Sequence, residues 1–481
     1  MASHSSLTLI HLFSILALAS SSTYTTTITT TASATNTVTL SLSPITATTA
    51  NTNPWQKLNQ LAYSSIARAR HLKHPHRHTS TSSLIKTPLF ARSYGGYSVS
   101  LRFGTPPQTL SFIMDTGSSL VWFPCTRRYI CLNCSFAGGS STKVSPFIPK
   151  LSSSAKLLDC KNPKCGWVFG ADVLSHCPIC HKSSGNCTRT CPAYGIKYGS
   201  GSTSGLLLSE TLKFPGRFVK DFVVGCSILS TQQPSGTGIA GFGRGRESLP
   251  VQMGLKKFSY CLVSHRFDDT PESSDMVLVA GRLGSGERKI RGLRYTSFLN
   301  NRRAPNPAFR NYYYVNLRTI TVGGERAKVP RKFLVPGYDG NGGTIVDSGT
   351  SFTFMAKTVF EAVANELEKQ MANYSRAADV ENLSGLRPCF NISGKQSVVF
   401  PELVFHFNGG AKMELPLDDY FAFLGDVGVV CMTIVTEGGA GGPAADKGPA
   451  IILGNYQQQN FYLEYDLEKE RLGFKRQICK S

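Results

Sequence analysis

The stretch DTGSS at residues 115–119 returns in nearly the same form as DSGTS at residues 347–351. Each copy follows an apolar run, at residues 110–114 and 344–346, of the kind that forms a buried strand. A lone Asp-Thr-Gly is typical of a β-turn, because Asp and Gly favour turns for reasons of their own backbone. Two copies in matching surroundings indicate a duplicated structural unit.

Other elements recur around the two copies in the same order. Residues 97–101 (YSVSL) return as residues 313–317 (YYVNL), and Ile239-Ala240-Gly241 returns as Ile452-Leu453-Gly454. The repeat predicts two lobes of one topology. The boundary is expected near residues 285–310, which are polar and rich in turn formers.

The repeat predicts a chemistry for Asp115 and Asp347. A pseudo-two-fold arrangement brings the two carboxylates face to face, and like charges a few ångströms apart share one proton because both do not ionise readily. One carboxylate then acts as general base on a water, and the protonated one polarises a scissile carbonyl. Such a pair needs no metal or cofactor. Four neighbours are expected to support it, through hydroxyl groups or through close backbone approach: Ser118, Thr350, Gly117 and Gly349.

With these motifs the sequence resembles the pepsin-type aspartic proteases, and more narrowly their plant nepenthesin-type branch, over about residues 90–481. The resemblance implies an all-β, bilobal pepsin-like fold, with two pseudo-symmetric β-barrel-like lobes and an active-site cleft between them. It implies a secreted aspartic endopeptidase that hydrolyses protein or peptide substrates, with an acid pH optimum. It assigns Tyr198, which precedes GSGS, as the flap tyrosine over substrate, and Trp122 as its support. Tyr194 competes for the flap role but lacks the second glycine.

A non-catalytic binding protein on the same fold is the rival hypothesis, and both intact Asp motifs argue against it.

The fourteen cysteines indicate disulfides in an oxidising compartment. The units Cys131-x-x-Cys134 and Cys177-x-x-Cys180 leave a zinc site as an alternative. Eleven cysteines precede residue 290 and three follow it, so complete pairing requires a bridge between the halves. The family resemblance implies the bridge Cys389–Cys431, which leaves Cys479 to reach back to Cys226 or Cys261.

The N-terminal residues are predicted to be processed. Residues 1–19 have the apolar run and the Ala-Leu-Ala ending of a signal peptide, and no later run is long enough to anchor the chain in a membrane. Residues 20–90 are interpreted as a disordered tract (20–50) followed by a basic pro-segment. Within the latter, residues 55–78 can form an amphipathic helix whose cations pair with carboxylates of the mature domain until acid protonates them. A linker or a nuclear-localisation patch is the alternative for this stretch.

The N-terminal peptidase lobe with a Cys-rich insertion is expected at 91–290, and the C-terminal lobe at 300–481.

The composition is basic, with 51 Lys plus Arg against 30 Asp plus Glu. No nucleic-acid-reading module accompanies this charge, so we expect no nucleic-acid partner and consider association with acidic cell-wall polymers. We expect a monomer located in the apoplast or cell wall, with the vacuole as the alternative. Five Asn-x-Ser/Thr sequons are candidate glycosylation sites: Asn133, Asn186, Asn373, Asn382 and Asn391.

Overall fold

The computed structural model describes residues 37–44, 53–75, 95–132, 145–177, 189–198, 201–231, 238–264, 273–281, 290–301, 304, 306–424, 428–437 and 447–479. The predicted signal peptide and the sequons at Asn133 and Asn186 lie outside these residues. Within them, no helix is long and apolar enough to cross a membrane.

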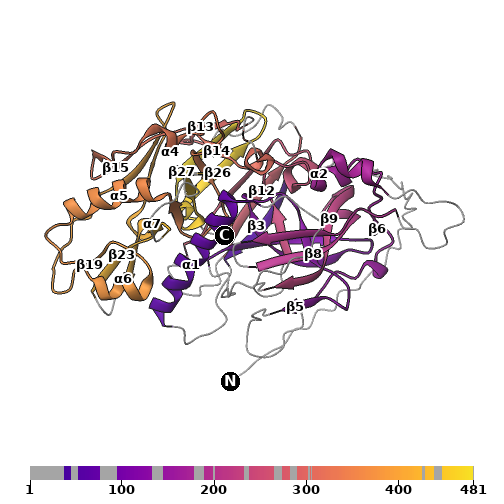
Figure 1. The fold of residues 1–481 in the computed structure, drawn as a ribbon, viewed down its shortest axis with the longest axis horizontal. Helices are drawn as coiled ribbons and strands as arrows, with labels where there is room; N and C mark the ends of the chain where they lie inside the picture. Colours follow the sequence, from indigo (N-terminus) through magenta and orange to yellow (C-terminus); the bar gives the residue numbers. More distant parts are fainter. Residues whose placement is uncertain are drawn as a thin grey trace, which may run out of the picture. The chain divides into compact units, whose positions relative to one another are not determined.

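The N-terminal half is built almost entirely from strands (Figure 1). These are β2 (Tyr97–Phe103), β3 (Gln108–Asp115), β4 (Trp122–Pro124), β5 (Ile130–Leu132), β6 (Lys156–Leu157), β7 (Tyr194–Tyr198), β8 (Gly201–Phe214), β9 (Arg217–Thr231), β10 (Gly238–Gly241), β11 (Lys257–Cys261) and β12 (Ser274–Val279). The short helices α2 (Cys165–Phe169) and α3 (Leu249–Gln252) connect them.

The C-terminal half repeats this strand-rich pattern and adds more helix. Its strands are β13 (Arg294–Leu299), β14 (Tyr314–Val315), β15 (Leu317–Val322), β16 (Glu325–Arg326), β17 (Thr344–Val346), β18 (Thr353–Met355), β19 (Cys389–Asn391), β20 (Leu403–Phe407), β21 (Lys412–Glu414), β22 (Phe421–Leu424), β23 (Val429–Met432), β24 (Ile434–Val435), β25 (Ile451–Leu453), β26 (Phe461–Asp466) and β27 (Arg471–Arg476). Its helices are α4 (Arg331–Leu334), α5 (Lys357–Gln370), α6 (Ala378–Ser384) and α7 (Leu417–Tyr420).

The two halves share one topology around their Asp-containing loops, as the internal repeat predicts. In the first half β10 pairs in parallel with β3 and antiparallel with β4. In the second half β25 pairs in parallel with β17 and antiparallel with β18. The bilobal, strand-rich architecture predicted from the sequence is therefore confirmed.

A single sheet joins the halves, with strands in the order β2-β1-β12-β11-β26-β27-β13. The strand β1 (Thr37–Pro44) lies inside it and connects β2 to β12. The composition of residues 20–50 predicts disorder, and this prediction is wrong for β1. Val38 and Leu42 alternate with Thr and Ser, and both become buried between two neighbouring strands that satisfy the backbone of β1. The rest of that tract lies outside the described residues.

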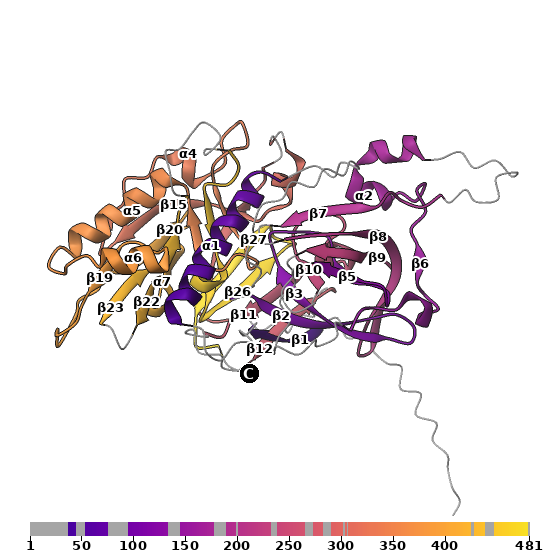
Figure 2. The same cartoon turned by 60° about the horizontal axis from the view of Figure 1, so that its bottom comes forward.

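The predicted basic helix is confirmed as α1 (Pro54–Lys73), which begins at the cap residue Asn53. It lies between the strands of the two halves in both ribbon views (Figures 1 and 2). Its buried side chains include Leu58, Leu61 and Leu72, and they join a cluster of C-terminal-half residues that contains Phe309. The helix is amphipathic, as predicted, but its buried face also contains charged residues.

Disulfides hold both halves. The bridge Cys389–Cys431 is present as the resemblance implied, and Cys479 reaches back to Cys261, one of its two predicted partners. The other described bridges are Cys125–Cys226, Cys160–Cys177 and Cys165–Cys191. The zinc alternative is contradicted, because Cys177 is bridged to Cys160 and Cys131 is disulfide-bonded too.

Candidate active site

The ends of one strand from each half position the two aspartates next to each other. Asp115 is the last residue of β3, and Asp347 directly follows β17. The bracing strands hold the adjacent backbone, since the Phe242 N–H donates to Asp115 O at 2.7 Å and the Asp347 N–H donates to Leu453 O at 3.0 Å. Asp115 is 2% exposed and Asp347 is fully buried. Carboxylates are rarely buried this completely unless they have partners.

The first loop directs several donors at Asp115. The Ser118 hydroxyl donates to Asp115 Oδ2 at 2.6 Å, and the Gly117 N–H donates to Oδ1 at 2.9 Å. A β-carbon on Gly117 would overlap the carboxylate of Asp347 from the other half. Glycine is therefore required here by the close approach of the two loops.

The second loop repeats this arrangement around Asp347. The Thr350 hydroxyl donates to Asp347 Oδ2 at 2.6 Å, and the Gly349 N–H donates to Oδ1 at 2.9 Å. A β-carbon on Gly349 would overlap the carboxylate of Asp115. The matching distances show that the two loops surround their carboxylates in the same way.

Thr116 and Ser348 lock the two loops together. The Thr116 N–H donates to Ser348 Oγ at 3.1 Å, and the Ser348 N–H donates to Thr116 Oγ1 at 2.9 Å. Each hydroxyl then donates to a carbonyl of the opposite half, Thr116 to Val346 O at 3.2 Å and Ser348 to Met114 O at 2.9 Å. Both side chains are fully buried. This reciprocal network fixes the separation of the two aspartates.

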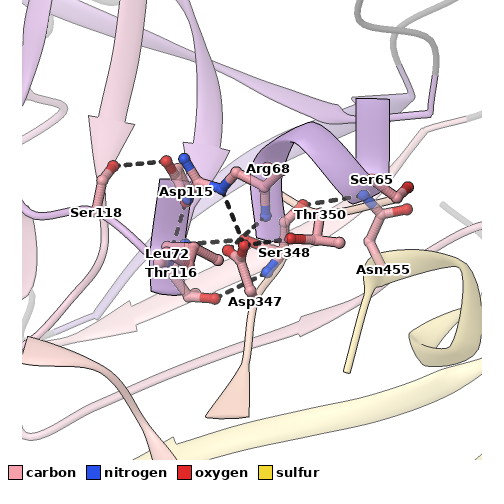
Figure 3. Close-up of polar contacts among 12 residues, drawn as sticks. Ser65, Arg68, Leu72, Asp115, Thr116, Ser118, Asp347, Ser348, Thr350 and Asn455 are labelled. Carbon is pink, nitrogen blue, oxygen red and sulfur yellow. Dashed lines mark hydrogen bonds and ion pairs between the residues drawn. The ribbon is translucent and has the colours of Figure 1, made fainter. Parts of the chain in front are cut away.

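Arg68, on the buried face of α1, lies in front of both carboxylates (Figure 3). Its Nη2 is 2.6 Å from Asp115 Oδ1, and its Nε is 3.1 Å from Asp347 Oδ2. Its side chain is 9% exposed. The guanidinium therefore offsets the negative charge of the pair in a place that water hardly reaches.

The two carboxyl groups are electrostatically unequal. Burial raises the pKa of Asp115 to about 6; the charge of Arg68 opposes this rise and that of Asp347 adds to it. Burial also favours the neutral form of Asp347, but Arg68 and the Thr350 hydroxyl outweigh it, so the pKa of Asp347 lies below its ordinary value. Burial would lower the pKa of Arg68, but the two carboxylates raise it, so the guanidinium stays charged.

Further contacts fix α1 on the C-terminal half. The Phe352 N–H donates to Ser65 Oγ at 2.9 Å, and the Tyr312 hydroxyl donates to the carbonyl of Leu72 at 3.1 Å. Ser65 and Leu72 lie on either side of Arg68 along the helix (Figure 3). Docking on both sides holds the guanidinium in register with the carboxylates.

The predicted flap residues lie beside the dyad. The indole Nε1–H of Trp122 donates to the hydroxyl of Tyr198 at 2.7 Å, and both side chains are buried. The ring of His71, one turn after Arg68 on α1, lies 5.9 Å from the Tyr198 ring between centroids. The helix thus contacts Tyr198 as well as the two aspartates.

The other predicted sites lie at the surface. Asn373, Asn382 and Asn391 are exposed, as glycosylation would require. At Asn391 the side-chain Oδ1 accepts hydrogen bonds from the N–H and the hydroxyl of Ser393, the third residue of its sequon. In the described part of the chain, no cluster of three or more His, Cys, Asp or Glu side chains could hold a metal ion.

Sequence reasoning did not single out Arg68, Thr116 or Ser348. A hydroxyl residue directly after each of the two repeated aspartates was a visible signal for the last two, because the repeat places them symmetrically. For Arg68 the signal was a cation on the apolar stripe of the helix, three residues after Ser65 and four before Leu72.

The sequence is similar to known families and proteins. Family models described as xylanase inhibitor N-terminal and C-terminal match residues 97–280 and 312–476. A probable aspartyl protease of Arabidopsis thaliana is 33% identical over 425 residues, which cover 80% of this chain and 82% of the relative. Aspartic proteinase nepenthesin-2 of Nepenthes gracilis is 32% identical over 399 residues, covering 82% of this chain and 80% of the relative.

The chain belongs to the plant aspartic protease family that includes the nepenthesins. Solved structures agree on the fold of this aspartic protease. The crystal structure of edgp matches with a TM-score of 0.60 at 19% identity, over 81% of this chain and 94% of that one. Basic 7S globulin from soybean matches with a TM-score of 0.56 at 18% identity, over 80% and 94%.

Proposed function

We propose that the protein is an aspartic endopeptidase in which Asp115 and Asp347 activate a water against the scissile peptide bond. The observation that carries this proposal is the symmetry of the site. Each buried carboxylate accepts one hydroxyl hydrogen bond and one backbone N–H hydrogen bond, at equal distances in the two loops. Neither carboxylate has a metal-binding set of neighbours among the described residues.

The pKa values of the two carboxyl groups belong to the precursor, where Arg68 holds the pKa of Asp347 below its ordinary value and opposes the rise of that of Asp115. Once Arg68 has left, the two buried carboxyl groups are expected to share one proton. The protonated one polarises the substrate carbonyl, and the ionised one takes a proton from the attacking water. A pair in which one carboxyl is neutral and the other ionised over the acid range gives activity an acid optimum.

We propose further that the chain as described is an inactive precursor. Arg68 contacts an oxygen of both aspartates, and those oxygens cannot hold a catalytic water at the same time. The helix that carries Arg68 also contacts the flap tyrosine. Removal of α1 then uncovers the dyad, and we expect the mature chain to begin between residues 80 and 95.

Export from the cell fits the bonding of the cysteines. The described bridges, including the long-range pair Cys261–Cys479, persist in oxidising compartments and are rare in the cytosol. We therefore propose secretion to the apoplast or cell wall, or delivery to the vacuole. The destination is the compartment from which the processed chain is recovered, and N-terminal sequencing identifies that chain.

The proposal is tested with the purified full chain, assayed at neutral pH and after incubation in acid. Hydrolysis of a peptide library is expected only after acid treatment, and a statine-type transition-state mimic should abolish it. A fully processed chain that binds the mimic but cleaves no peptide favours the rival, a binding protein on the same fold. Cleavage that the mimic does not affect contradicts the aspartic mechanism.

A further inference from the structure

The N-terminal half has a row of side chains on the outer face of its sheet, which are exposed except for the half-buried Lys213. Arg102 on β2 lies directly opposite Thr109 on β3 and directly opposite Lys213 on β8. Lys213 in turn lies opposite Phe218 on β9. Directly paired residues of antiparallel strands point to the same face, so the four side chains form one continuous row across β3, β2, β8 and β9. In Figure 2, β2 lies beside β3, and β8 lies beside β9.

Two features of this row are unfavourable for the isolated chain. Like charges directly opposite each other on neighbouring strands are destabilising, and Arg102 and Lys213 form such a pair. Phe218 is 60% exposed, which leaves most of its ring in water. The Lys220 ammonium lies 5.5 Å from the centroid of the same ring and adds a third cation to the row. A partner that is anionic and also presents an apolar surface would relieve both features.

The surroundings add hydroxyl groups. Ser100 and Ser111 pair across β2 and β3, two residues along from Arg102 and Thr109, and both are exposed. The period of two along a strand places them on the same face as the row. We define the basic row as Arg102, Lys213, Phe218 and Lys220, with Thr109, Ser100 and Ser111 as its hydroxyl border.

We propose that the basic row binds a carboxylated polysaccharide of the polyuronate class. The cations pair with uronate carboxylates, the ring of Phe218 packs on the apolar face of a sugar ring, and the hydroxyl border bonds to sugar hydroxyls. Single-stranded nucleic acid also combines anions with stackable rings. The disulfides favour the polysaccharide, because such bridges persist in oxidising compartments and are rare in the cytosol. The surface belongs to the N-terminal half alone and does not involve the dyad.

The test measures binding of the full chain to three soluble polymers at one ionic strength. These are polygalacturonate, the same polymer with its carboxyl groups methyl-esterified, and poly(U). Polygalacturonate should bind most tightly, and esterification should weaken binding at least about tenfold because the ion pairs are lost. Equal binding of the esterified polymer, or tighter binding of poly(U), overturns the proposal.

Matched variants locate the surface. The double variant Arg102→Gln/Lys213→Gln should weaken polygalacturonate binding about tenfold, since exposed ion pairs each contribute a few-fold. The control Arg318→Gln/Lys412→Gln removes the same charge from exposed positions on β15 and β21 and should change binding less than about twofold.

Loss of binding in the control equal to that in the double variant would show an effect of net charge only and would contradict the proposal. Phe218→Ser should weaken binding about fivefold without changing its salt dependence, because the ring contributes apolar contact. If the double variant fails to fold by circular dichroism, the single variants replace it, and unchanged affinity in both of them also counts against the basic row.

Discussion

Arg68 Nη2 lies 2.6 Å from Oδ1 of Asp115, and this short charged contact joins the N-terminal helix to the catalytic loop. The same guanidinium reaches Asp347 through Nε, so one side chain pairs with both carboxylates and offsets one of their two negative charges. A buried pair of like charges is unfavourable in itself, and a shared cation relieves it. In the proposed precursor, the docking of α1 is thereby stabilised by the same carboxylates that we propose to be catalytic.

Arg68→Met should loosen α1 and lower the barrier to activation. Removing one partner of a buried ion pair costs about 3–5 kcal/mol, and here the loss falls on the docking of the helix. The variant chain should begin to hydrolyse peptide at a higher pH than the unmodified chain. Arg70→Met is the control, because Arg70 pairs with Glu437 at an exposed position. Equal activation profiles of the two variants would show that Arg68 does not hold the dyad closed.

Release of α1 should depend on pH in two steps. As the pH falls through about 6, Asp115 takes up a proton, and Arg68 then faces one negative charge instead of two. Asp347 has a lowered pKa, so its contribution to holding Arg68 persists below the usual Asp range and is lost only as the pH falls through that lowered pKa. After correction for the intrinsic pH dependence of exchange, the protection of the amide hydrogens of Pro54–Lys73 should therefore fall modestly near pH 6 and strongly in more acid solution. Protection that is independent of pH would contradict this coupling.

Trp122→Phe should weaken catalysis while the chain remains folded. The substitution keeps a buried aromatic ring but removes the N–H that donates to Tyr198, a loss of about 1 kcal/mol or about fivefold in kcat/KM. Steady-state kinetics of the processed enzyme measure the effect. Trp167→Phe, in α2, is the control and should leave kcat/KM unchanged. A variant at Trp122 with normal kcat/KM would remove the indole from the flap mechanism.

Ser348→Ala should destabilise the whole fold. It leaves the buried Thr116 N–H and the Met114 carbonyl without their hydroxyl partner, and each unsatisfied group costs about 1–3 kcal/mol. Denaturant unfolding gives the change in the free energy of unfolding. The control Ser100→Ala alters an exposed hydroxyl and should change it by less than about 0.5 kcal/mol. Equal unfolding curves would contradict the locking role of Ser348.

The two-lobed fold and the dyad could be predicted because the chain repeats itself. The Asp loops, the bracing strands and the preceding strands recur in order, so symmetry alone places Asp115 opposite Asp347. The odd number of cysteines in each half required a bridge between the halves, and the bridge Cys389–Cys431 implied by the family resemblance left Cys479 to form it.

Contacts between segments far apart in the sequence could not be predicted this way. Strand β1 gains its order from β2 and β12, which supply backbone partners on both sides, while its composition of Thr and Ser indicates disorder. Arg68 is one of several cations in the basic segment, and only the docked position of α1 shows that it is the one that contacts the two aspartates. The pairing of Arg102 with Lys213 likewise depends on strand register, which no local pattern specifies.

The central claim is that Asp115 and Asp347 form the catalytic pair of a protease. It is tested most directly by measuring peptide hydrolysis at acid pH by Asp115→Asn and Asp347→Asn chains from which the pro-segment has been removed, with circular dichroism to verify folding. Loss of one carboxylate removes a general acid or base, so each variant should lose at least about a thousandfold in kcat while remaining folded. A folded variant that retains activity within about tenfold of the unmodified enzyme would contradict the account.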